Sequence, residues 1–321
     1  MHSSSLALVC SVALLGCGSG NDAATGGAGG SGGDGGSGGG LMRFDCDAPD
    51  PVNCPEMPPS AIDAERPAQV VVPSDYTTST RYPLIVVLHG RGATGAANAI
   101  YLGASQRVEE RQFVLVAPDG TQDTEGRLAW NAGAIDSVFE PEAPDDIGYV
   151  RSLIAEARKT YRLDGHRIYL LGTSNGGHLA LDIICEDPAS VTAVLSQAGA
   201  LPADVPCADG TVSLLSVHGT EDEVVAFGGG VRESGITILS AVNLVAGFAE
   251  RSGCGPLEML ANLDLVPMPP GAETRVRSYS DCDAQAESAL WVVQQAPHVP
   301  DFTDEARDLW FDWMFARARP E

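Results

Sequence analysis

A serine flanked by glycines is the first group in this sequence whose spacing indicates chemistry. Residues 172–176 read Gly-Thr-Ser-Asn-Gly, directly after the apolar run 167–171 and directly before a segment with helical periodicity. In a strand–turn–helix setting the glycines allow a turn so tight that the serine hydroxyl stands above the sheet edge, beside the positive end of the helix. The pentapeptide alone is a weak signal in a glycine-rich chain, but its flanks fit this setting. We therefore predict that Ser174 is a nucleophile.

A serine hydroxyl is a weak nucleophile near neutral pH and needs an imidazole to take its proton during attack. Among the six histidines, His298 is predicted to be this base, because it follows an apolar run, has a loop to itself and precedes the final helical segment. His178 is the alternative, but it stands one helical turn beyond Ser174, where its side chain is expected to project away from the hydroxyl. The other histidines are interpreted as structural: His2 lies in the N-terminal segment, His166 in a turn, and His89 and His218 each precede a glycine at a strand end.

A carboxylate must hold the imidazole in the right tautomer and stabilise the imidazolium that forms. Asp222 is predicted to supply it, because it ends the sequence His-Gly-Thr-Glu-Asp that follows the apolar run 212–217. Glu221 and Asp119 are the alternatives. Asp301 is close to the predicted base in sequence, but we expect it to belong to the N-terminal cap of the last helix. The chain order Ser, Asp, His is one of the orders in which such triads occur.

Two backbone N–H groups are expected to stabilise the negative charge that develops on the substrate oxygen. One belongs to Asn175, directly after the nucleophile. The other belongs to Arg91, which follows His89 and Gly90 at the end of an apolar run. Besides the structural role given above, His89 is a candidate for contact with the substrate.

Apolar runs alternate with helical segments along most of the chain, the pattern of parallel strands joined by crossover helices. In such sheets ligands bind beyond the carboxyl ends of the strands, which is where the candidate side chains lie. We therefore predict a single doubly wound α/β domain over residues 45–321, with a mostly parallel sheet and helices on both faces. The expected strands are residues 69–72, 84–88, 113–117, 167–171, 191–195, 212–217, 274–280 and 289–294, and the expected helices are residues 96–111, 146–161, 175–186, 238–251 and 304–318.

The N-terminal segment has the pattern of an export signal. Residues 6–15 are apolar but too short to cross a bilayer as a helix, and the sequence Leu-Leu-Gly-Cys ends the stretch at Cys17. This resembles a bacterial lipoprotein signal, so we predict a signal peptide over residues 1–16 and a lipid anchor at Cys17. An ordinary secretory signal with an incidental Cys17 is the alternative. Residues 17–44 are rich in Gly and Ser and are expected to form a flexible tether.

The expected protein is therefore exported, either as a lipoprotein of the outer membrane or cell surface or as an extracellular protein. The lipid is its one expected link to a membrane. The net charge of −24 argues against a nucleic-acid partner, because phosphate binding needs clustered Lys and Arg. We expect a monomer with neither a metal nor a cofactor.

Cysteine usage agrees with export. Of the eight cysteines, six remain when Cys10 in the signal and Cys17 are set aside, and they show no C-x-x-C spacing that would indicate zinc. Free buried thiols are one interpretation of these six. The other, which we favour from chain order, is a set of disulfides, namely Cys46–Cys54, Cys185–Cys207 and Cys254–Cys282.

Several short motifs together resemble one family. They are Leu88-His89-Gly90, Pro118-Asp119-Gly120-Thr121, Trp130-Asn131-Ala132-Gly133, Asp-Asp-Ile-Gly-Tyr-Val at 145–150, Gly-Thr-Ser-Asn-Gly-Gly at 172–177 and His-Gly-Thr-Glu-Asp at 218–222. Over residues 65–320 the set is similar to the polyhydroxybutyrate depolymerase and feruloyl esterase group of α/β-hydrolases. The resemblance implies a secreted esterase without a cofactor, acting on hydroxyalkanoate polyesters or on acyl groups of plant polysaccharides. It gives Ser174, Asp222 and His298 the roles stated above, and it implies that Trp130 lines the acyl pocket, with a core tryptophan as the alternative.

Two features depart from the pattern of this family. Around the base the family has a run like Gly-Gly-His-Thr-Trp-Pro, whereas residues 296–300 read Ala-Pro-His-Val-Pro, a change expected to alter the mouth of the pocket. The helix after the nucleophile carries His178 where the family has Met. Taken together, the motifs predict a serine carboxylic-ester hydrolase that works through an acyl-enzyme. A serine peptidase on the same fold and a non-catalytic surface lipoprotein with a retained hydrolase shell are the alternatives.

Overall fold

The computed structural model describes most of the chain beyond its N-terminal segment. The elements described below lie in the unit that runs from Arg43 to Glu321. No helix in this described part is long and apolar enough to cross a membrane. The predicted signal peptide, the lipid anchor at Cys17 and nearly all of the predicted tether lie outside the described residues. The described residues are 44–49, 51, 53–63, 65–132, 135, 139 and 143–320.

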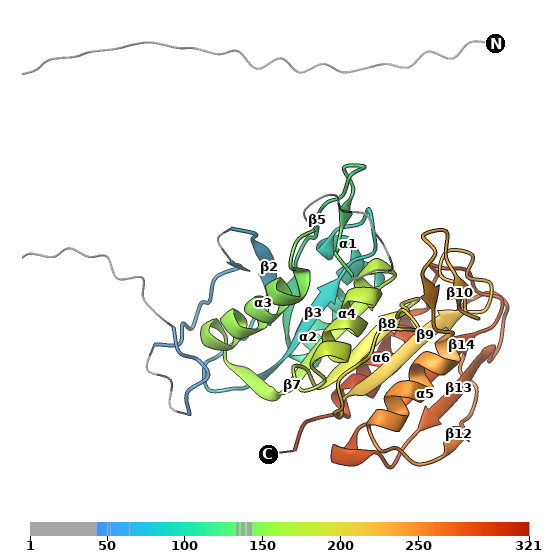
Figure 1. The fold of residues 1–321 in the computed structure, drawn as a ribbon. Coiled ribbons are helices and arrows are strands. Elements are labelled where there is room, and N and C mark those ends of the chain that lie inside the picture. The colour runs from blue at the N-terminus through green and yellow to red at the C-terminus, as the bar shows by residue number, and fades with distance from the viewer. Residues whose placement is uncertain are drawn as a thin grey trace, which may run out of the picture. The chain divides into compact units, whose positions relative to one another are not determined.

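Within the described residues, ten strands form one sheet in the order β1-β2-β4-β3-β7-β8-β9-β14-β13-β12 (Figure 1). The six central strands, from β4 to β14, pair in parallel, and the pairs towards both edges are antiparallel. The predicted doubly wound, mostly parallel sheet is therefore confirmed. The strands are β1 (Ala61–Ile62), β2 (Ala68–Val71), β3 (Tyr82–Leu88), β4 (Val114–Ala117), β7 (Leu163–Thr173), β8 (Ala193–Gln197), β9 (Ser213–Gly219), β12 (Leu257–Met259), β13 (Thr274–Tyr279) and β14 (Ser288–Val293).

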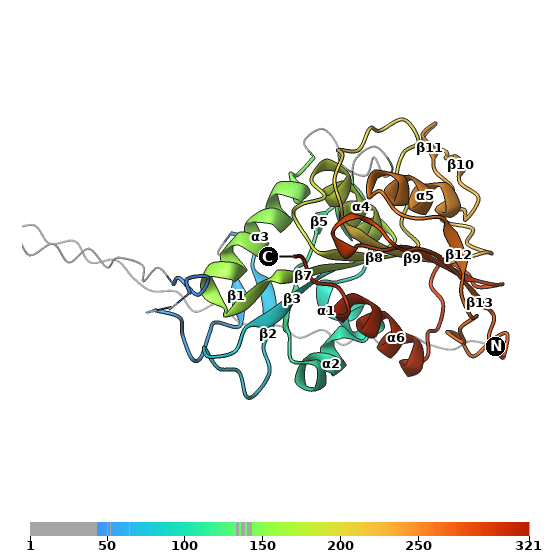
Figure 2. The ribbon, with the colours of Figure 1, turned by 90° about the horizontal axis from the view of Figure 1, so that it is seen from below.

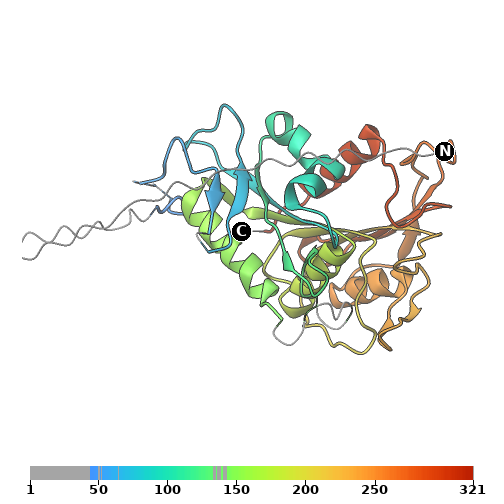
Figure 3. The ribbon, with the colours of Figure 1, turned by 90° about the horizontal axis from the view of Figure 1, so that it is seen from above.

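Helices cover both faces of this sheet, as Figures 2 and 3 show from opposite sides. Side chains of a strand alternate between the faces, so a strand buried on both sides is apolar throughout. In β3, for example, Val86 packs in one core cluster and Val87 in the other. The first cluster contains residues of α3 (Asp146–Thr160), α4 (Asn175–Glu186) and α5 (Ala241–Arg251), and the second contains residues of α1 (Gly95–Tyr101), α2 (Ala104–Arg111) and α6 (Asp304–Phe315).

Short elements account for most differences from the sequence-based prediction. The helix expected over residues 96–111 is two helices, because Gly103 between them adopts a left-handed conformation with φ of 78°. Strands of two or three residues were not predicted, since so short a run carries no readable periodicity. They are β1, β12, the hairpin of β5 (Thr121–Gln122) with β6 (Leu128–Ala129), and the hairpin of β10 (Gly230–Val231) with β11 (Thr237–Ile238).

The start of the last helix also differs from the prediction. The N-cap of α6 is Thr303, whose hydroxyl accepts a hydrogen bond from the Ala306 N–H at 3.0 Å. The expectation that Asp301 belongs to this cap is therefore wrong. Thr303, two residues later, is the residue that satisfies a helix N–H group here.

The structure pairs the six cysteines in chain order. The disulfides are Cys46–Cys54, Cys185–Cys207 and Cys254–Cys282. The second fastens the last turn of α4 to the loop that follows β8, and the third fastens the segment after α5 to the segment before β14. These cross-links restrict the unfolded chain and so stabilise the folded one.

The turn from β7 into α4 is tightly packed. A Cβ atom on Gly172 would lie 2.3 Å from the Gly176 carbonyl oxygen, and one on Gly176 would lie 2.2 Å from the Leu88 carbonyl oxygen. Real Cβ atoms do not approach backbone oxygens so closely, so both positions require glycine. Between them Ser174 has φ of 52° and ψ of −118°, which turns the chain abruptly from strand to helix. The predicted glycine-flanked turn is thus present, and it packs against the end of β3.

The packing of Gly176 gives a direct test of this turn. Helix propensity alone would favour alanine over glycine in α4 by roughly 1 kcal/mol. We expect the opposite, a loss of about 2 kcal/mol or more in the free energy of unfolding of Gly176→Ala, because the added methyl group overpacks a filled site. Urea denaturation of the variant and of the parent protein measures the difference.

Gly228→Ala is the matched control, since a Cβ atom at Gly228 would meet nothing within 4 Å. Its free energy of unfolding should stay within about 0.5 kcal/mol of the parent value. Equal stability of the Gly176→Ala variant and the parent would contradict the close approach of β3 to this turn.

Candidate active site

Three side chains that the sequence analysis singled out meet in one hydrogen-bonded row. The Nε2 atom of His298 lies 2.8 Å from Oγ of Ser174, and its Nδ1 atom lies 2.8 Å from Oδ2 of Asp222. Ser174 directly follows β7, Asp222 lies in the loop after β9, and His298 lies in the loop after β14. All three loops leave the carboxyl ends of parallel strands, the edge at which α/β sheets bind ligands.

Gln197, the last residue of β8, ties two parts of this row together through hydrogen bonds of 2.8 Å. Its carbonyl oxygen accepts the Ser174 N–H, and its side-chain amide donates to the His298 carbonyl oxygen. Gln197 is buried. Sequence analysis missed this residue, although a long amide side chain at the end of a predicted buried strand was a signal that could have marked it.

The loops of Asp222 and His298 are also joined to each other. The Glu221 N–H donates to the Ala296 carbonyl oxygen at 3.0 Å, and the Gln295 N–H donates to Oγ1 of Thr220 at 2.8 Å. These bonds fix the base relative to its carboxylate through the backbone.

Asp222 is buried and accepts hydrogen bonds at both carboxylate oxygens. Its Oδ1 accepts from the N–H groups of Val224 at 2.9 Å and Val225 at 2.7 Å. Its Oδ2 faces Nδ1 of His298 and, at 3.2 Å, Nε2 of His218. Burial by itself would raise the pKa of Asp222, but the hydrogen bonds from His218, His298 and Val225 outweigh it and hold the pKa well below its usual value. The carboxylate is therefore ionised at neutral pH.

His218 is a contact of Asp222 that sequence analysis did not foresee. Its buried Nε2 atom lies 2.8 Å from the Val225 carbonyl oxygen as well as 3.2 Å from Asp222 Oδ2. Both neighbours are acceptors, so Nε2 carries a proton. Its Nδ1 atom is buried without a hydrogen-bond partner among the described residues. His218 was interpreted as structural from its place before Gly219, and the structure adds this side-chain contact with Asp222.

The alternative residues occupy other places. Nδ1 of His178 accepts the backbone N–H of Ala200 at 2.8 Å, so the ring is engaged away from the serine hydroxyl. Oδ1 of Asp119 accepts the Gly95 N–H at 2.7 Å, at the start of α1. Glu221 joins the row through its backbone, as described above, and its side chain is exposed. The imidazole that faces the Ser174 hydroxyl is therefore that of His298, and the carboxylate that faces this imidazole is that of Asp222.

The loop that carries Arg91 packs against the nucleophile turn. A Cβ atom on Gly90 would lie 3.5 Å from Cβ of Ser174 and 3.4 Å from the Thr173 carbonyl oxygen. The Arg91 guanidinium is held by Asp123, with 2.6 Å between Nε and Oδ2. Asn175, the first residue of α4, lies directly beyond Ser174. Both backbone segments that were predicted to form an oxyanion hole therefore adjoin the serine.

His89 and Trp130 differ from their predicted role. Both side chains are 0% exposed. Nε2 of His89 accepts the Gly120 N–H at 2.8 Å, and Nε1 of Trp130 donates to the His89 carbonyl oxygen at 2.9 Å. The prediction that these side chains contact the substrate is therefore not supported, because their surfaces are already covered. Trp130 matches the alternative of a core tryptophan.

The two residues instead position the nucleophile turn. Oδ1 of Asn175 accepts the Trp130 N–H at 2.7 Å, and its Nδ2 donates to the Trp130 carbonyl oxygen at 3.0 Å. Burial lowers the pKa of His89, which keeps the ring neutral and able to accept from Gly120. The segment around Trp130 thus holds Asn175 in place.

Comparison with known proteins identifies relatives of this chain. Residues 60–231, more than half of the chain, match the model of the Esterase family, described as "Putative esterase". The chain is 23% identical over 252 residues to "Feruloyl esterase D" of Neurospora crassa, covering 74% of this chain and 76% of that protein. It is 28% identical over 151 residues to "Putative esterase NocK" of Nocardia uniformis, covering 46% of this chain and 42% of that protein. This second match therefore spans less than half of its relative's length.

A solved structure shows the same fold. The "Acetyl xylan esterase from Aspergillus awamori" aligns with a TM-score of 0.53 and 12% identity, over 77% of this chain and 94% of that one. The relationship to feruloyl-esterase-like α/β-hydrolases predicted from the motifs is confirmed, whereas the relationship to polyhydroxybutyrate depolymerases stays a prediction. The chain belongs to the Esterase family and has the α/β-hydrolase fold.

Proposed function

We propose that the protein is a carboxylic-ester hydrolase in which Ser174 forms an acyl-enzyme. The observation that supports it best is the continuous row from the Ser174 hydroxyl through His298 to the buried carboxylate of Asp222, with both links at 2.8 Å. Such a row lets the imidazole take the hydroxyl proton while the carboxylate stabilises the imidazolium that results.

In the proposed mechanism Ser174 Oγ attacks the ester carbonyl carbon and transfers its proton to Nε2 of His298. The negative charge that develops on the carbonyl oxygen is stabilised by the backbone N–H groups of Asn175 and Arg91. Collapse breaks the bond to the alcohol, which leaves with the proton from His298. Water then attacks the acyl-enzyme with His298 as its base, and the acid and the free serine are released.

An ester is the substrate favoured by the comparisons, because the family and the relatives named above are esterases. A serine peptidase is correspondingly less favoured. The alternative of a non-catalytic shell is opposed by the assembled hydrogen bonds, since a protein without activity has no need to keep a strained serine against an imidazole. The feruloyl esterase and acetyl xylan esterase among the relatives favour feruloyl or acetyl groups on polysaccharides as the acyl groups removed.

We also propose that the protein acts outside the cytoplasm. Its disulfides fit an oxidising compartment, because the cytosol keeps most thiols reduced. The lipid anchor at Cys17 and the monomeric state remain part of this proposal as predictions from the sequence.

Replacement of the nucleophile tests the proposed function. Ser174→Ala should lower kcat for p-nitrophenyl acetate and for methyl ferulate by at least about a thousandfold, because loss of a triad nucleophile removes the acyl-enzyme route. The exposed Ser152 of α3 provides a matched control, and Ser152→Ala should retain the parent rate. Activity of Ser174→Ala within threefold of the parent would rule out this serine as the nucleophile.

The same mechanism gives His218 a positioning role, because its Nε2–H donates to the oxygen of Asp222 that faces His298. His218→Phe keeps a ring of similar size but removes this donor. We expect kcat/KM to fall about 10- to 100-fold, the effect of losing a hydrogen bond to a charged group. The pH–rate profile should also change, because the Asp222 carboxylate loses one of the hydrogen bonds that hold its pKa down.

His218→Gln restores an amide N–H at a similar reach and should recover part of the rate and of the profile. Urea denaturation of each variant separates a loss of stability from a change in the site. An unmoved pH profile with no recovery in the glutamine variant would show that His218 acts through folding alone.

A further inference from the structure

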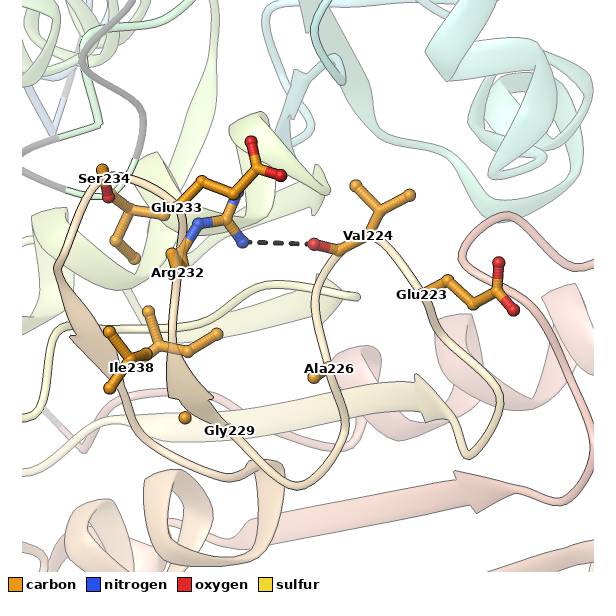
Figure 4. A pocket seen from close by; sticks show the side chains of 11 residues that line it. Glu223, Val224, Ala226, Gly229, Arg232, Glu233, Ser234 and Ile238 are labelled. Atoms are coloured by element: carbon orange, nitrogen blue, oxygen red, sulfur yellow. Dashed lines mark hydrogen bonds between the residues drawn. The ribbon is translucent and has the colours of Figure 1, made fainter.

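A hollow lies beside the loop that carries Asp222 (Figure 4). It has a volume of about 410 Å³ and is formed almost entirely by the segment between Glu223 and Ile238, which leads from β9 towards α5. The mechanism proposed above uses none of the side chains that line it. They are Ile135, Glu223, Val224, Ala226, Val231, Arg232, Glu233, Ser234 and Ile238, with Gly229 and Gly230 contributing backbone.

The pocket and the triad share one turn of the chain. On one side of this turn, the N–H groups of Val224 and Val225 hold the carboxylate of Asp222. On the other side, the Val224 carbonyl oxygen accepts a hydrogen bond of 3.2 Å from Nη1 of Arg232, across the pocket (Figure 4). A group bound in the pocket therefore lies next to the residues that orient His298.

The walls of the pocket are fixed before any ligand arrives. The hairpin of β10 and β11 forms one wall, with Gly230 paired to Ile238 and Val231 to Thr237. Its second strand is fastened to the loop after β8, since Leu201 accepts the Leu239 N–H at 2.9 Å and Thr237 accepts the Ala203 N–H at 2.8 Å. A framework held by backbone bonds loses little entropy when it binds.

The lining combines several kinds of exposed group. Glu233 lies beside Arg232 on the hairpin, and Glu223 lies beyond Val224 on the facing segment (Figure 4). Ser234 adds a hydroxyl at the tip of the hairpin. Val224 and Val231 present small apolar surfaces, 58% and 73% exposed. The pocket thus offers acceptors, donors and small apolar faces together.

This combination discriminates between ligand classes. Two carboxylates, on a chain with a net charge of −24, repel an anionic group and outnumber the one arginine. No aromatic side chain is among the described residues that line the pocket, so these residues offer no ring on which an aromatic group could stack. A wholly apolar acyl chain would desolvate the carboxylates without replacing their hydrogen bonds. A neutral ligand rich in hydroxyl groups satisfies donors and acceptors alike.

We propose that this pocket is a glycosyl subsite, which binds a neutral sugar unit on the alcohol side of the ester whose acyl group is transferred to Ser174. The inference rests on the proposed ester hydrolysis and assigns a binding site to the carbohydrate part of the ester. The carboxylate of Glu233 accepts sugar hydroxyl protons, and Arg232 and Ser234 donate to sugar oxygens.

Two acetyl esters with different alcohols test the subsite. The substrates are an acetylated xylotriose and p-nitrophenyl acetate, and the measured quantity is the ratio of their kcat/KM values. Ala226→Trp fills the pocket, and Glu233→Gln changes one acceptor. We expect this ratio to fall at least tenfold in the tryptophan variant and about threefold in the glutamine variant, mainly through KM for the sugar ester. Glu258→Gln, on the edge strand β12, is the matched control and should keep the parent ratio.

A binding measurement separates this inference from the proposed function. Calorimetric titration of Ser174→Ala with unacetylated xylotriose should show binding that Ala226→Trp, introduced into the same protein, removes. If the parent protein hydrolyses no ester but still binds xylotriose, the proposed function is contradicted, whereas the sugar-binding site is supported. An unchanged ratio in both variants, or xylotriose binding that survives the filled pocket, would overturn the subsite.

Discussion

The imidazole of His298 is the one group on which the rest of the site depends. It can serve the hydroxyl of Ser174 only while Asp222 stays ionised and holds its other nitrogen, at 2.8 Å on each side. A buried carboxylate would normally resist ionisation. Here two backbone N–H groups and His218 supply the hydrogen bonds that keep the charge in place. In the proposed mechanism, these hydrogen bonds inside an otherwise apolar part of the fold are what make the Ser174 hydroxyl reactive.

The fold brings these groups together because all of them leave the same edge of a parallel sheet. Their separations along the chain are 124 residues between Ser174 and His298 and 76 between Asp222 and His298. Hydrogen bonds between the loops of Asp222 and His298, and from the side chain of Gln197 to His298, then restrict the movement of these loops. The close approach of Gly176 to the end of β3 fixes the nucleophile turn in the same way.

Much of this arrangement could be predicted from the sequence, because long buried strands and a glycine-flanked serine carry strong local patterns. Ser174, Asp222 and His298 each follow an apolar run, and that position was enough to find them. The contacts of His218 could not be predicted in the same way, because they form only when the loop after β9 folds back and brings Val225 to the ring. The Trp130 backbone is held by the side chain of Asn175, 45 residues away, a contact that no local pattern indicates. The β10–β11 hairpin is too short for any periodicity, so the pocket beside Asp222 was beyond sequence analysis.

The central claim is that His298 makes the Ser174 hydroxyl nucleophilic. Diisopropyl fluorophosphate phosphorylates an activated serine with loss of fluoride, and mass spectrometry of the digested protein locates the modified residue. Our account expects one phosphoryl group per chain, on the peptide that contains Ser174, and none in the His298→Ala variant. Modification of a different residue, or equal labelling of Ser174 when His298 is absent, would contradict it.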